Sequence, residues 1–416
     1  MKVLVIGSGG REHALVSKFG ENSSVEKIYC APGNGGTFRE GKCENVNITQ
    51  LDELLSFALE NKIDITIVGS EEWLVLGIVD KFKESGLKIL GPSRKAAKLE
   101  GSKAYSKEFM KKYGIKTAAY AVFENEKLAT EYLKNCEYPI VIKADGLAAG
   151  KGVVICNDFI EAKKSINDFM ILDIFKGSGK KIIIEEFLQG VEASILSITD
   201  GKIIIPFISS KDHKQIFDGD KGPNTGGMGA IAPNPYCNKN VLDEFYQHIL
   251  MPTLKGIQEE VMDYTGIIFF GIMITSKGVY LLEYNVRFGD PETQAVLPLM
   301  KSDFTDLVTC ALEGELEKFK LEWKEGYSCC VIASSEGYPS SYNTGYVINE
   351  LDKLKGKLFL AGSIYEDGML KTAGGRVFGI TGIGETLEKA REIAYTDMKK
   401  IQFEGMYYRT DIGKLN

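Results

Sequence analysis

The stretch MKVLVIGSGGREHALVSKFG, residues 1–20, sets the fold of the first part of the chain. Its apolar strand VLVIG (3–7) runs into glycines and then into an expected helix over about 11–20. The same order follows with KIYCAPGN (27–34), helical LDELLSFALENK (51–62), ITIVG (65–69), a further helix and LKILGPS (87–93). Strands that alternate with helices predict βαβ units around a parallel sheet of Rossmann-like type, whose ligands bind at the carboxyl ends of the strands.

The glycines of the first turn do not complete a dinucleotide-binding fingerprint. G-x-G-x-x-G requires a third glycine where the helix packs on the strand, and Glu12 stands at that place. A carboxylate there would repel a pyrophosphate at the helix N-terminus. Two interpretations stay open: a generic glycine turn, or a turn in which Gly9, Gly10 and Arg11 hold the phosphate of a smaller ligand.

Composition limits the function classes. A chain of 416 residues is expected to form about two to four domains, and 44% hydrophobic with 26% charged residues is typical of a globular protein. A net charge of −7 argues against general nucleic-acid binding. The eight cysteines show no metal-type spacing and are interpreted as reduced thiols. We recognise neither a signal peptide nor a membrane span, so a cytoplasmic enzyme without membrane contacts is expected.

The pattern changes near residue 102. YPIVIKADGLAAGKGVVIC (138–156) predicts two strands around a glycine-rich turn. GLAAGKG (146–152) is not a P-loop, because three residues separate its first glycines and Gly152 follows Lys151; such a hairpin can still fold over a triphosphate. A helix (158–170), a strand (181–188), a hairpin (193–210), a long polar loop (211–230) and a second hairpin (267–289) are expected next. Beyond about 325, short strands and one helix suggest an α+β tail.

The segment LLEYNVRFGDPE (281–292) carries the strongest chemical signal. Strand alternation places Glu283, Asn285 and Arg287 on one face, with Leu282, Tyr284, Val286 and Phe288 on the other. A carboxylate, an amide oxygen and a guanidinium in one row suit a divalent cation beside a transferring phosphoryl group. The alternative is an ordinary polar strand face turned to solvent.

Six motifs together carry a resemblance to a known family. GSGGREHA, GSKAYSKEFM, VIKADGLAAGKGV, IEEFLQGVEAS, GPNTGGMGA and EYNVRFGDPETQ occur in this order. The whole chain resembles the phosphoribosylamine–glycine ligase family, also called glycinamide ribonucleotide synthetase, of the ATP-grasp superfamily. The resemblance implies a multidomain α/β and α+β protein: a Rossmann-like (preATP-grasp) N-terminal domain (1–101), an ATP-grasp domain (102–324) with a mobile lid (about 117–188), and a small α+β C-terminal domain (325–416).

The same resemblance implies an activity. Members join glycine to 5-phosphoribosylamine in de novo purine biosynthesis, consuming ATP with Mg²⁺ or Mn²⁺ and passing through glycyl phosphate to glycinamide ribonucleotide, ADP and phosphate. The alternatives are another ATP-grasp carboxylate–amine ligase or a carboxylase and, from a different class, a non-catalytic nucleotide-binding protein. The partners expected are these small substrates. The sequence does not decide the oligomeric state, and a monomer is the working expectation.

On the donor side, the resemblance assigns residues to ATP, metal and catalysis. Lys103 and Lys143 would contact the ATP phosphates beneath the loop 144–152, and Arg287 would stabilise the acyl phosphate together with Lys143. Glu283 and Asn285 would bind the metal. The further nucleotide residues are Gly150, Lys151, Gly152, Glu185, Glu186, Phe187, Leu188 and Glu192. Of these, residues 185–188 would hold the adenine, and Glu192 would bind the ribose. The alternative for 185–188 is an ordinary strand end.

On the acceptor side, the implied substrate contacts come from five stretches of the chain. They are Gly9, Gly10, Arg11, Glu12, Gly33, Asn34, Gly35, Asp212, Lys214, Asn224, Thr225, Gly226, Gly227 and Asp290. Residues 224–229 would bind an anion, either the carboxylate of glycine or the sugar phosphate. His213 receives no catalytic role. GSEEWLVL (69–76) departs from the family pattern because it lacks both prolines, although Glu71 is kept.

Overall fold

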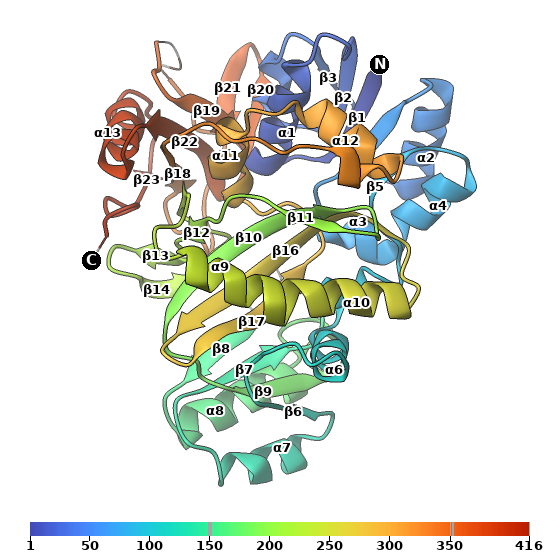
Figure 1. Cartoon of the computed structure of the whole chain (residues 1–416). Helices are drawn as coiled ribbons and strands as arrows, with labels where there is room; N and C mark the ends of the chain where they lie inside the picture. The colour runs from blue at the N-terminus through green and yellow to red at the C-terminus, as the bar shows by residue number, and fades with distance from the viewer. Residues whose placement is uncertain (149–151, 350, 352, 416) are drawn as a thin grey trace.

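The computed structural model of the chain describes residues 1–148, 152–349, 351 and 353–415. Figure 1 shows the N-terminal domain and the C-terminal domain side by side at the top, a central sheet below them and the lid at the bottom. The predicted Rossmann-like domain, ATP-grasp domain and C-terminal α+β domain are confirmed as the fold class. No helix within the described residues is long and apolar enough to cross a membrane.

The N-terminal domain is a parallel sheet between helices. Its strands are β1 (Lys2–Gly7), β2 (Lys27–Pro32), β3 (Cys43–Asn45), β4 (Ile65–Val68) and β5 (Ile89–Pro92), in the order β3-β2-β1-β4-β5. Alternate residues of β1 enter two hydrophobic clusters: Leu4 packs in the cluster that includes Phe82, and Val5 in the one that includes Phe19. Both faces are therefore covered, by helices α1 (Gly10–Gly20), α2 (Leu51–Glu60), α3 (Glu71–Leu76) and α4 (Ile78–Glu84).

This sheet continues into the central domain. β5 pairs antiparallel with β16 (Tyr264–Thr275), which lies between β10 (Val191–Thr199) and β17 (Gly278–Asn285); β11 (Ile204–Pro206) forms the edge. Helices α9 (Lys239–Phe245) and α10 (Met251–Glu259) lie across this part of the sheet (Figure 1). Helix α5 (Lys98–Gly101) ends the N-terminal domain, and the other helices of the central domain outside the lid are α6 (Lys103–Lys112), α11 (Glu292–Val296) and α12 (Phe304–Leu312). The pairing places the loops of the N-terminal domain beside the end of β17.

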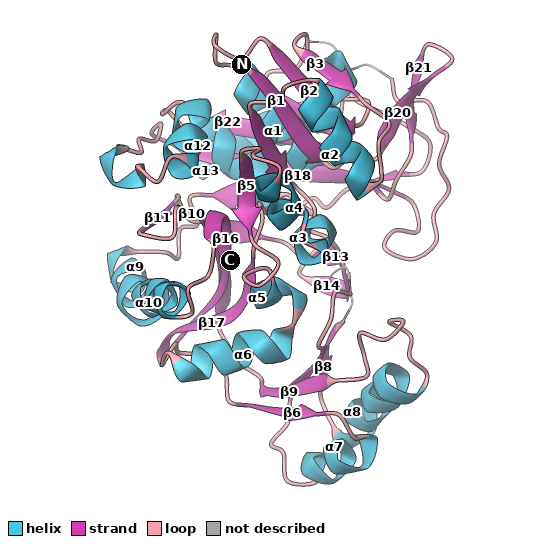
Figure 2. Cartoon of the chain, turned by 90° about the vertical axis from the view of Figure 1, so that its right-hand side faces the viewer, coloured by secondary structure: helices cyan, strands magenta, loops and turns pink. Residues whose placement is uncertain are grey.

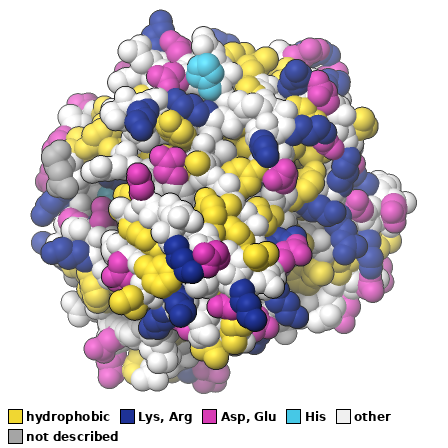
Figure 3. Space-filling model, turned by 90° about the horizontal axis from the view of Figure 1, so that it is seen from below, with side chains coloured by type: hydrophobic (Ala, Val, Ile, Leu, Met, Phe, Trp, Pro, Cys, Tyr) yellow, Lys and Arg dark blue, Asp and Glu magenta, His cyan; other side chains and the backbone are white. Residues whose placement is uncertain are grey.

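The lid has a sheet and a core of its own. Strands β6 (Tyr120–Phe123), β7 (Ile140–Ala144), β8 (Val153–Cys156) and β9 (Ile182–Glu186) pair antiparallel in the order β6-β9-β7-β8. Helices α7 (Glu126–Leu133) and α8 (Phe159–Ile166) cover one face through a separate hydrophobic cluster. Figure 3 shows the molecule from this lower side, where hydrophobic side chains are interspersed with charges of both signs.

The C-terminal domain corrects one sequence prediction. Residues 211–230, predicted as a long loop, contain four short strands: β12 (Lys211–Asp212), β13 (Gln215–Phe217), β14 (Lys221–Asn224) and β15 (Gly229–Ala232). β12 and β15 extend the C-terminal sheet, whose order is β12-β15-β18-β22-β19. The loop prediction was wrong because these strands are only two to four residues long. β13 and β14 pair with each other, and β15 joins the sheet through residues 328–331, about a hundred residues further on.

The remaining C-terminal elements complete this layer. They are β18 (Tyr327–Ser335), β19 (Lys357–Leu360), β22 (Arg376–Gly384), β23 (Met406–Tyr407), the ribbon β20 (Ser363–Glu366) with β21 (Met369–Thr372), and helix α13 (Leu387–Met398). Figure 2 shows the β20–β21 ribbon extending from this domain near β3 of the N-terminal domain. The main-chain N–H of Gly35 donates to the carbonyl of Ser363 at 2.9 Å, which joins the two domains.

Candidate active site

The polar row of β17 begins at a β-bulge. Gly271 pairs with Glu283 while Ile272 pairs with Leu281, so Leu282 is an extra residue in this strand. The prediction that Leu282 shares the buried face of Tyr284 is therefore wrong: Leu282 packs in a small cluster with Leu188 and Met273. From Glu283 onward the alternation is the predicted one, because Tyr284, Val286 and Phe288 are buried in the core.

Glu283 lies among positive charges. Burial by itself would raise the pKa of its carboxyl, but Lys214, Lys143 and Lys103, with Arg287, hold that pKa below its ordinary value. The four cations come from separate stretches of the chain. Such a concentration of positive charge around one ionised carboxylate suits the phosphates of a nucleotide together with a divalent cation.

Arg287 is fixed by acceptors on three sides. Its Nε lies 3.1 Å from Oε2 of Glu71, and its Nη2 lies 3.0 Å from Oε1 of Glu100 and 3.2 Å from Oδ1 of Asn285. Burial raises the pKa of Glu100 to about 7, although Arg287 opposes the shift. Burial by itself would also raise the pKa of Glu71, but Arg287 and Arg11 keep the pKa of that carboxyl below its ordinary value. Glu71 thus has a place in the site even without the missing prolines.

Sequence reasoning missed Glu100, although it directly precedes the GSKAYSKEFM motif, because its partners lie about 185 residues further along the chain. Its Oε2 accepts the main-chain N–H of Val286 at 2.7 Å, so Glu100 holds both the backbone at the end of β17 and the side chain of Arg287.

The predicted nucleotide side contains a buried cluster of two lysines and one carboxylate. Lys143 on β7 and Lys107 on α6 place their Nζ atoms 3.0 and 3.1 Å from Oε2 of Glu185 on β9. Oε1 of Glu185 is buried and has no hydrogen-bond partner among the described residues. Burial lowers the pKa of Lys107 to about 8 despite Glu185. Sequence reasoning missed Lys107, although its position four residues after Lys103 places both lysines on one helix face.

The other predicted nucleotide residues surround this cluster. Lys103 donates to the carbonyl of Gly146 at 3.2 Å. In the predicted adenine segment, Leu188 is buried against Met273, which provides an apolar surface. Phe187 is partly buried, and the side chain of Glu186 is exposed. The carbonyl of Gly152 accepts from Ala144 at 2.8 Å. Gly150 and Lys151 lie outside the described residues.

A second charged group lies between β10 and β12. Glu192 forms an ion pair with Lys214 at 2.7 Å, and the ammonium of Lys214 also interacts electrostatically with Glu283. Oδ1 of Asp212 is buried and has no partner among the described residues. Burial and the neighbouring carboxylate of Glu292 raise the pKa of Asp212 well above its ordinary value. Glu292, which accepts from the hydroxyl of Ser194 at 3.3 Å, is itself buried.

The glycine turn at 9–12 is closed by protein carboxylates. Oε2 of Glu12 accepts the N–H of Gly9, and Oε1 of Glu12 lies 2.6 Å from Nε of Arg11. The N–H of Arg11 donates to Oδ2 of Asp290 at 3.1 Å. Glu12 fills the interior of the turn, because a Cβ on Gly7 or on Gly9 would collide with its carboxylate. Substrate contacts of this turn stay a prediction. At Gly10, the space that a Cβ would occupy is next to the side-chain amide of Gln294.

The 33–35 loop is joined to this turn. The side-chain amide of Asn34 donates to the carbonyls of Ser8 and Gly9 at 2.9 and 3.0 Å and to that of Leu360 at 3.0 Å. Gly33 has φ of +76°, and a Cβ there would strike Asn45. The amide of Asn34 is therefore fully used within the protein, which gives this residue a structural part whether or not substrate also contacts the loop.

The 224–227 segment begins at Asn224, the last residue of β14, and contacts an arginine that sequence reasoning missed. The N–H of Gly227 donates to the hydroxyl of Thr225 at 2.9 Å, and this hydroxyl donates to the carbonyl of Lys214 at 2.7 Å. Nη1 of Arg376, on β22, contacts the carbonyls of Gly226 and Gly227 and lies 3.2 Å from Oδ1 of Asp290. This arginine lies about 150 residues further along the chain, which is why local motifs do not reveal it.

Glu283 and Asn285 fit a divalent cation in part. No group of three or more His, Cys, Asp or Glu side chains within the described ranges is arranged to hold a metal ion. Glu283, which nearby cations keep ionised, supplies a carboxylate oxygen, and Asn285 supplies an amide oxygen. Phosphate and water oxygens would have to complete the coordination.

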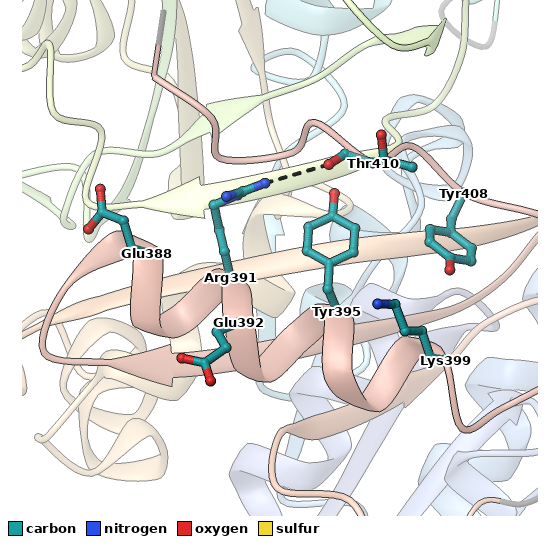
Figure 4. A pocket seen from close by; sticks show the side chains of 7 residues that line it. All are labelled: Glu388, Arg391, Glu392, Tyr395, Lys399, Tyr408 and Thr410. Atoms are coloured by element: carbon teal, nitrogen blue, oxygen red, sulfur yellow. Dashed lines mark hydrogen bonds between the residues drawn. The ribbon is translucent and has the colours of Figure 1, made fainter.

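A hollow of about 390 Å³ on the C-terminal domain lies outside this arrangement. Helix α13 lines it with Arg391 and Tyr395, and Tyr408 and Thr410 approach from the chain end (Figure 4). None of its lining residues is among the predicted site residues.

Three family models match the chain in succession. They describe the phosphoribosylglycinamide synthetase N domain (1–100), ATP-grasp (A) domain (101–293) and C domain (328–415). A phosphoribosylamine–glycine ligase of Clostridium acetobutylicum is 65% identical over 414 residues and covers 100% of both chains. One of Fusobacterium nucleatum is 53% identical, covering 100% of this chain and 99% of its own.

Solved structures give the same result. The crystal structure of a phosphoribosylamine–glycine ligase from Thermotoga maritima has a TM-score of 0.87 at 35% identity and covers 99% of this chain and 100% of its own. The biotin carboxylase domain of a Hydrogenobacter thermophilus 2-oxoglutarate carboxylase, in complex with MgADP, has a TM-score of 0.77 at 17% identity, covering 98% and 91%. The second likeness concerns the fold alone.

Proposed function

Because the chain belongs to the phosphoribosylglycinamide synthetase family, we propose that it joins glycine to 5-phosphoribosylamine, with ATP as the source of energy. The chain is a carbon–nitrogen ligase of the ATP-grasp class, and its products are glycinamide ribonucleotide, ADP and phosphate. Relatives of this name match the full length at 65% and 53% identity, whereas the carboxylase resemblance is limited to the fold. The carboxylase alternative is therefore not favoured.

One observation carries the assignment to phosphoryl transfer: Lys103, Lys143, Lys214 and Arg287 surround the ionised carboxylate of Glu283. Phosphoryl transfer depends on positioning and charge neutralisation more than on a protein nucleophile. We assign Lys103 and Lys143 to the phosphates of ATP. Leu188 supports the adenine, and the buried Glu185, held by Lys143, lies at the start of the adenine segment.

The reaction has two displacements. A carboxylate oxygen of glycine attacks the γ-phosphorus and the bond to ADP breaks, giving glycyl phosphate. The amine of phosphoribosylamine then attacks the acyl carbon, phosphate leaves, and the nitrogen loses a proton. Arg287, kept in place by Glu71 and Glu100, stabilises the negative charge on the acyl phosphate. We assign Asp212, whose pKa is raised by burial and by Glu292, to orient the amine and accept that proton.

A divalent cation, Mg²⁺ or Mn²⁺, would be held by Glu283 and Asn285, and when bound it would neutralise phosphate charge. Closing of the lid, which we assign to residues 117–188, would exclude water from the acyl phosphate. The separate sheet and core of β6–β9 support this assignment. We retain the domain bounds 1–101, 102–324 and 325–416, which are close to the ranges of the three family models.

An ADP-release assay with omission of each substrate tests the proposal. With the purified chain, a divalent cation and ATP, full-rate ADP formation should require both glycine and phosphoribosylamine. ADP release that depends on bicarbonate and not on glycine would instead identify a carboxylase. ADP release without any acceptor, or none under all conditions, would refute the ligase assignment.

A further inference from the structure

Arg376 crosses from the C-terminal domain to two segments of the central domain. Its Nη1 donates to the main-chain carbonyls of Gly226, Gly227 and Asp290, the last two at 3.3 and 2.8 Å, and it lies 3.2 Å from Oδ1 of Asp290. Four oxygens thus hold one nitrogen of the guanidinium. The orientation of the planar group is fixed by these contacts.

The other edge of this guanidinium is unused. Within the described part of the chain, Nε and Nη2 of Arg376 donate to no protein acceptor, and 21% of the side-chain surface is exposed. Three of the five N–H donors are therefore available. An Nε–Nη2 edge matches two oxygens of a phosphate or a carboxylate in a bidentate contact.

Gly226 makes room for this edge. A Cβ at Gly226 would lie 2.9 Å from Cζ, 3.1 Å from Nη2 and 3.2 Å from Nε of Arg376. The N–H of Gly226 donates to the hydroxyl oxygen of Tyr338 at 2.9 Å, so the O–H of this tyrosine is left to donate to another group. The guanidinium of Arg376 and the hydroxyl of Tyr338 therefore both lie next to Gly226.

The glycine turn at 9–12 offers an anion less than its motif suggests. The N–H groups of Gly9 and Arg11 already donate to the carboxylates of Glu12 and Asp290. An anion placed against these groups would face two negative charges at short range. Arg376, which contacts the same Asp290 carboxylate, offers its free Nε–Nη2 edge beside this turn.

We propose that Arg376 is a substrate-binding residue whose free edge binds an anionic group of the acceptor, which we assign to the phosphate of phosphoribosylamine. The inference rests on the proposed function. Glycine also carries an anion, but its carboxylate must react beside Glu283 and Arg287. The sugar phosphate is the anion that remains for Arg376.

Two substitutions test this assignment. Arg376→Met should raise KM for phosphoribosylamine about 10- to 100-fold, because hydrogen bonds to a charged group are lost, and should leave KM for ATP and glycine within about twofold. Arg376→Lys keeps the charge without the planar edge and should give a smaller rise. Ribose 5-phosphate, which has the phosphate but no amine, should compete with phosphoribosylamine in the wild type far better than ribose does, and this advantage should fall in both variants.

Arg391→Met is the matched control, since Arg391 belongs to the same domain and donates to the carbonyl of Ile412, away from the site. It should leave all three KM values unchanged. The assignment is overturned if Arg376→Met leaves KM for phosphoribosylamine unchanged, if all three KM values rise together, or if only KM for glycine rises. If the Met variant does not fold, the ribose 5-phosphate comparison in Arg376→Lys decides. Substrate omission with the wild type tests the ligase activity separately.

Discussion

Replacing Glu100 with Gln should change how stability depends on pH. Burial raises the pKa of this carboxyl to about 7 in the folded chain, against an ordinary value of 4.5. Between these values the folded state binds more protons than the unfolded state, so the wild type loses stability as pH rises. The difference between the folded and unfolded pKa corresponds to about 3 kcal/mol, most of which falls between pH 5 and pH 8.

Glutamine does not titrate, so Glu100→Gln removes this dependence. Urea unfolding of the wild type and the variant at half-unit steps from pH 5 to pH 8 gives the difference in unfolding free energy. We expect the wild type to lose about 2 to 3 kcal/mol relative to the variant over this range, whatever the offset between them at pH 5. A difference that stays constant within about 0.5 kcal/mol would refute the buried, partly protonated Glu100.

Glu71→Gln is the matched control, because Glu71 pairs with the same arginine but its pKa is lowered. A lowered carboxyl pKa gives stability that is present above the unfolded pKa and is lost as pH falls through the folded pKa. The wild type should therefore lose stability relative to Glu71→Gln only below about pH 4.5, and the difference should be flat from pH 5 to pH 8. Equal slopes for the two variants would contradict the opposite environments of the two carboxylates.

Three further substitutions test the site. Glu283→Gln should lower kcat about 100- to 1000-fold, by analogy with the loss of one preorganised electrostatic group, while circular dichroism stays that of the wild type; normal turnover would remove Glu283 from the metal site. Leu188→Ala should raise KM for ATP several-fold with KM for glycine unchanged, since it opens the apolar cluster with Met273; an unchanged KM for ATP would count against adenine there. Gly227→Ala should destabilise the chain by about 1–3 kcal/mol in urea unfolding and impair turnover, because φ is +109° and the added Cβ would lie 2.4 Å from Pro291; wild-type stability would contradict this geometry.

Much of the fold could be predicted from short-range pattern. Alternating strand and helix segments predicted the parallel sheet of the N-terminal domain, and two apolar runs around a turn predicted the β16–β17 hairpin. Period-two alternation also placed Glu283, Asn285 and Arg287 on one face, with Val286 and Phe288 buried. These features depend on neighbouring residues, whose spacing the sequence states directly.

What the sequence alone determined was therefore the order of elements and the polar row of β17. Tertiary structure decided the rest, because it depends on groups far apart in the chain. The bulge that turns Leu282 toward Leu188 arises from pairing with β16, and β15 becomes a strand where β18, about a hundred residues further on, offers hydrogen-bond partners. The long-range contacts of Glu100 and Arg376 follow the same rule: a buried charge is placed by partners that the folded chain brings together, and no local spacing records them.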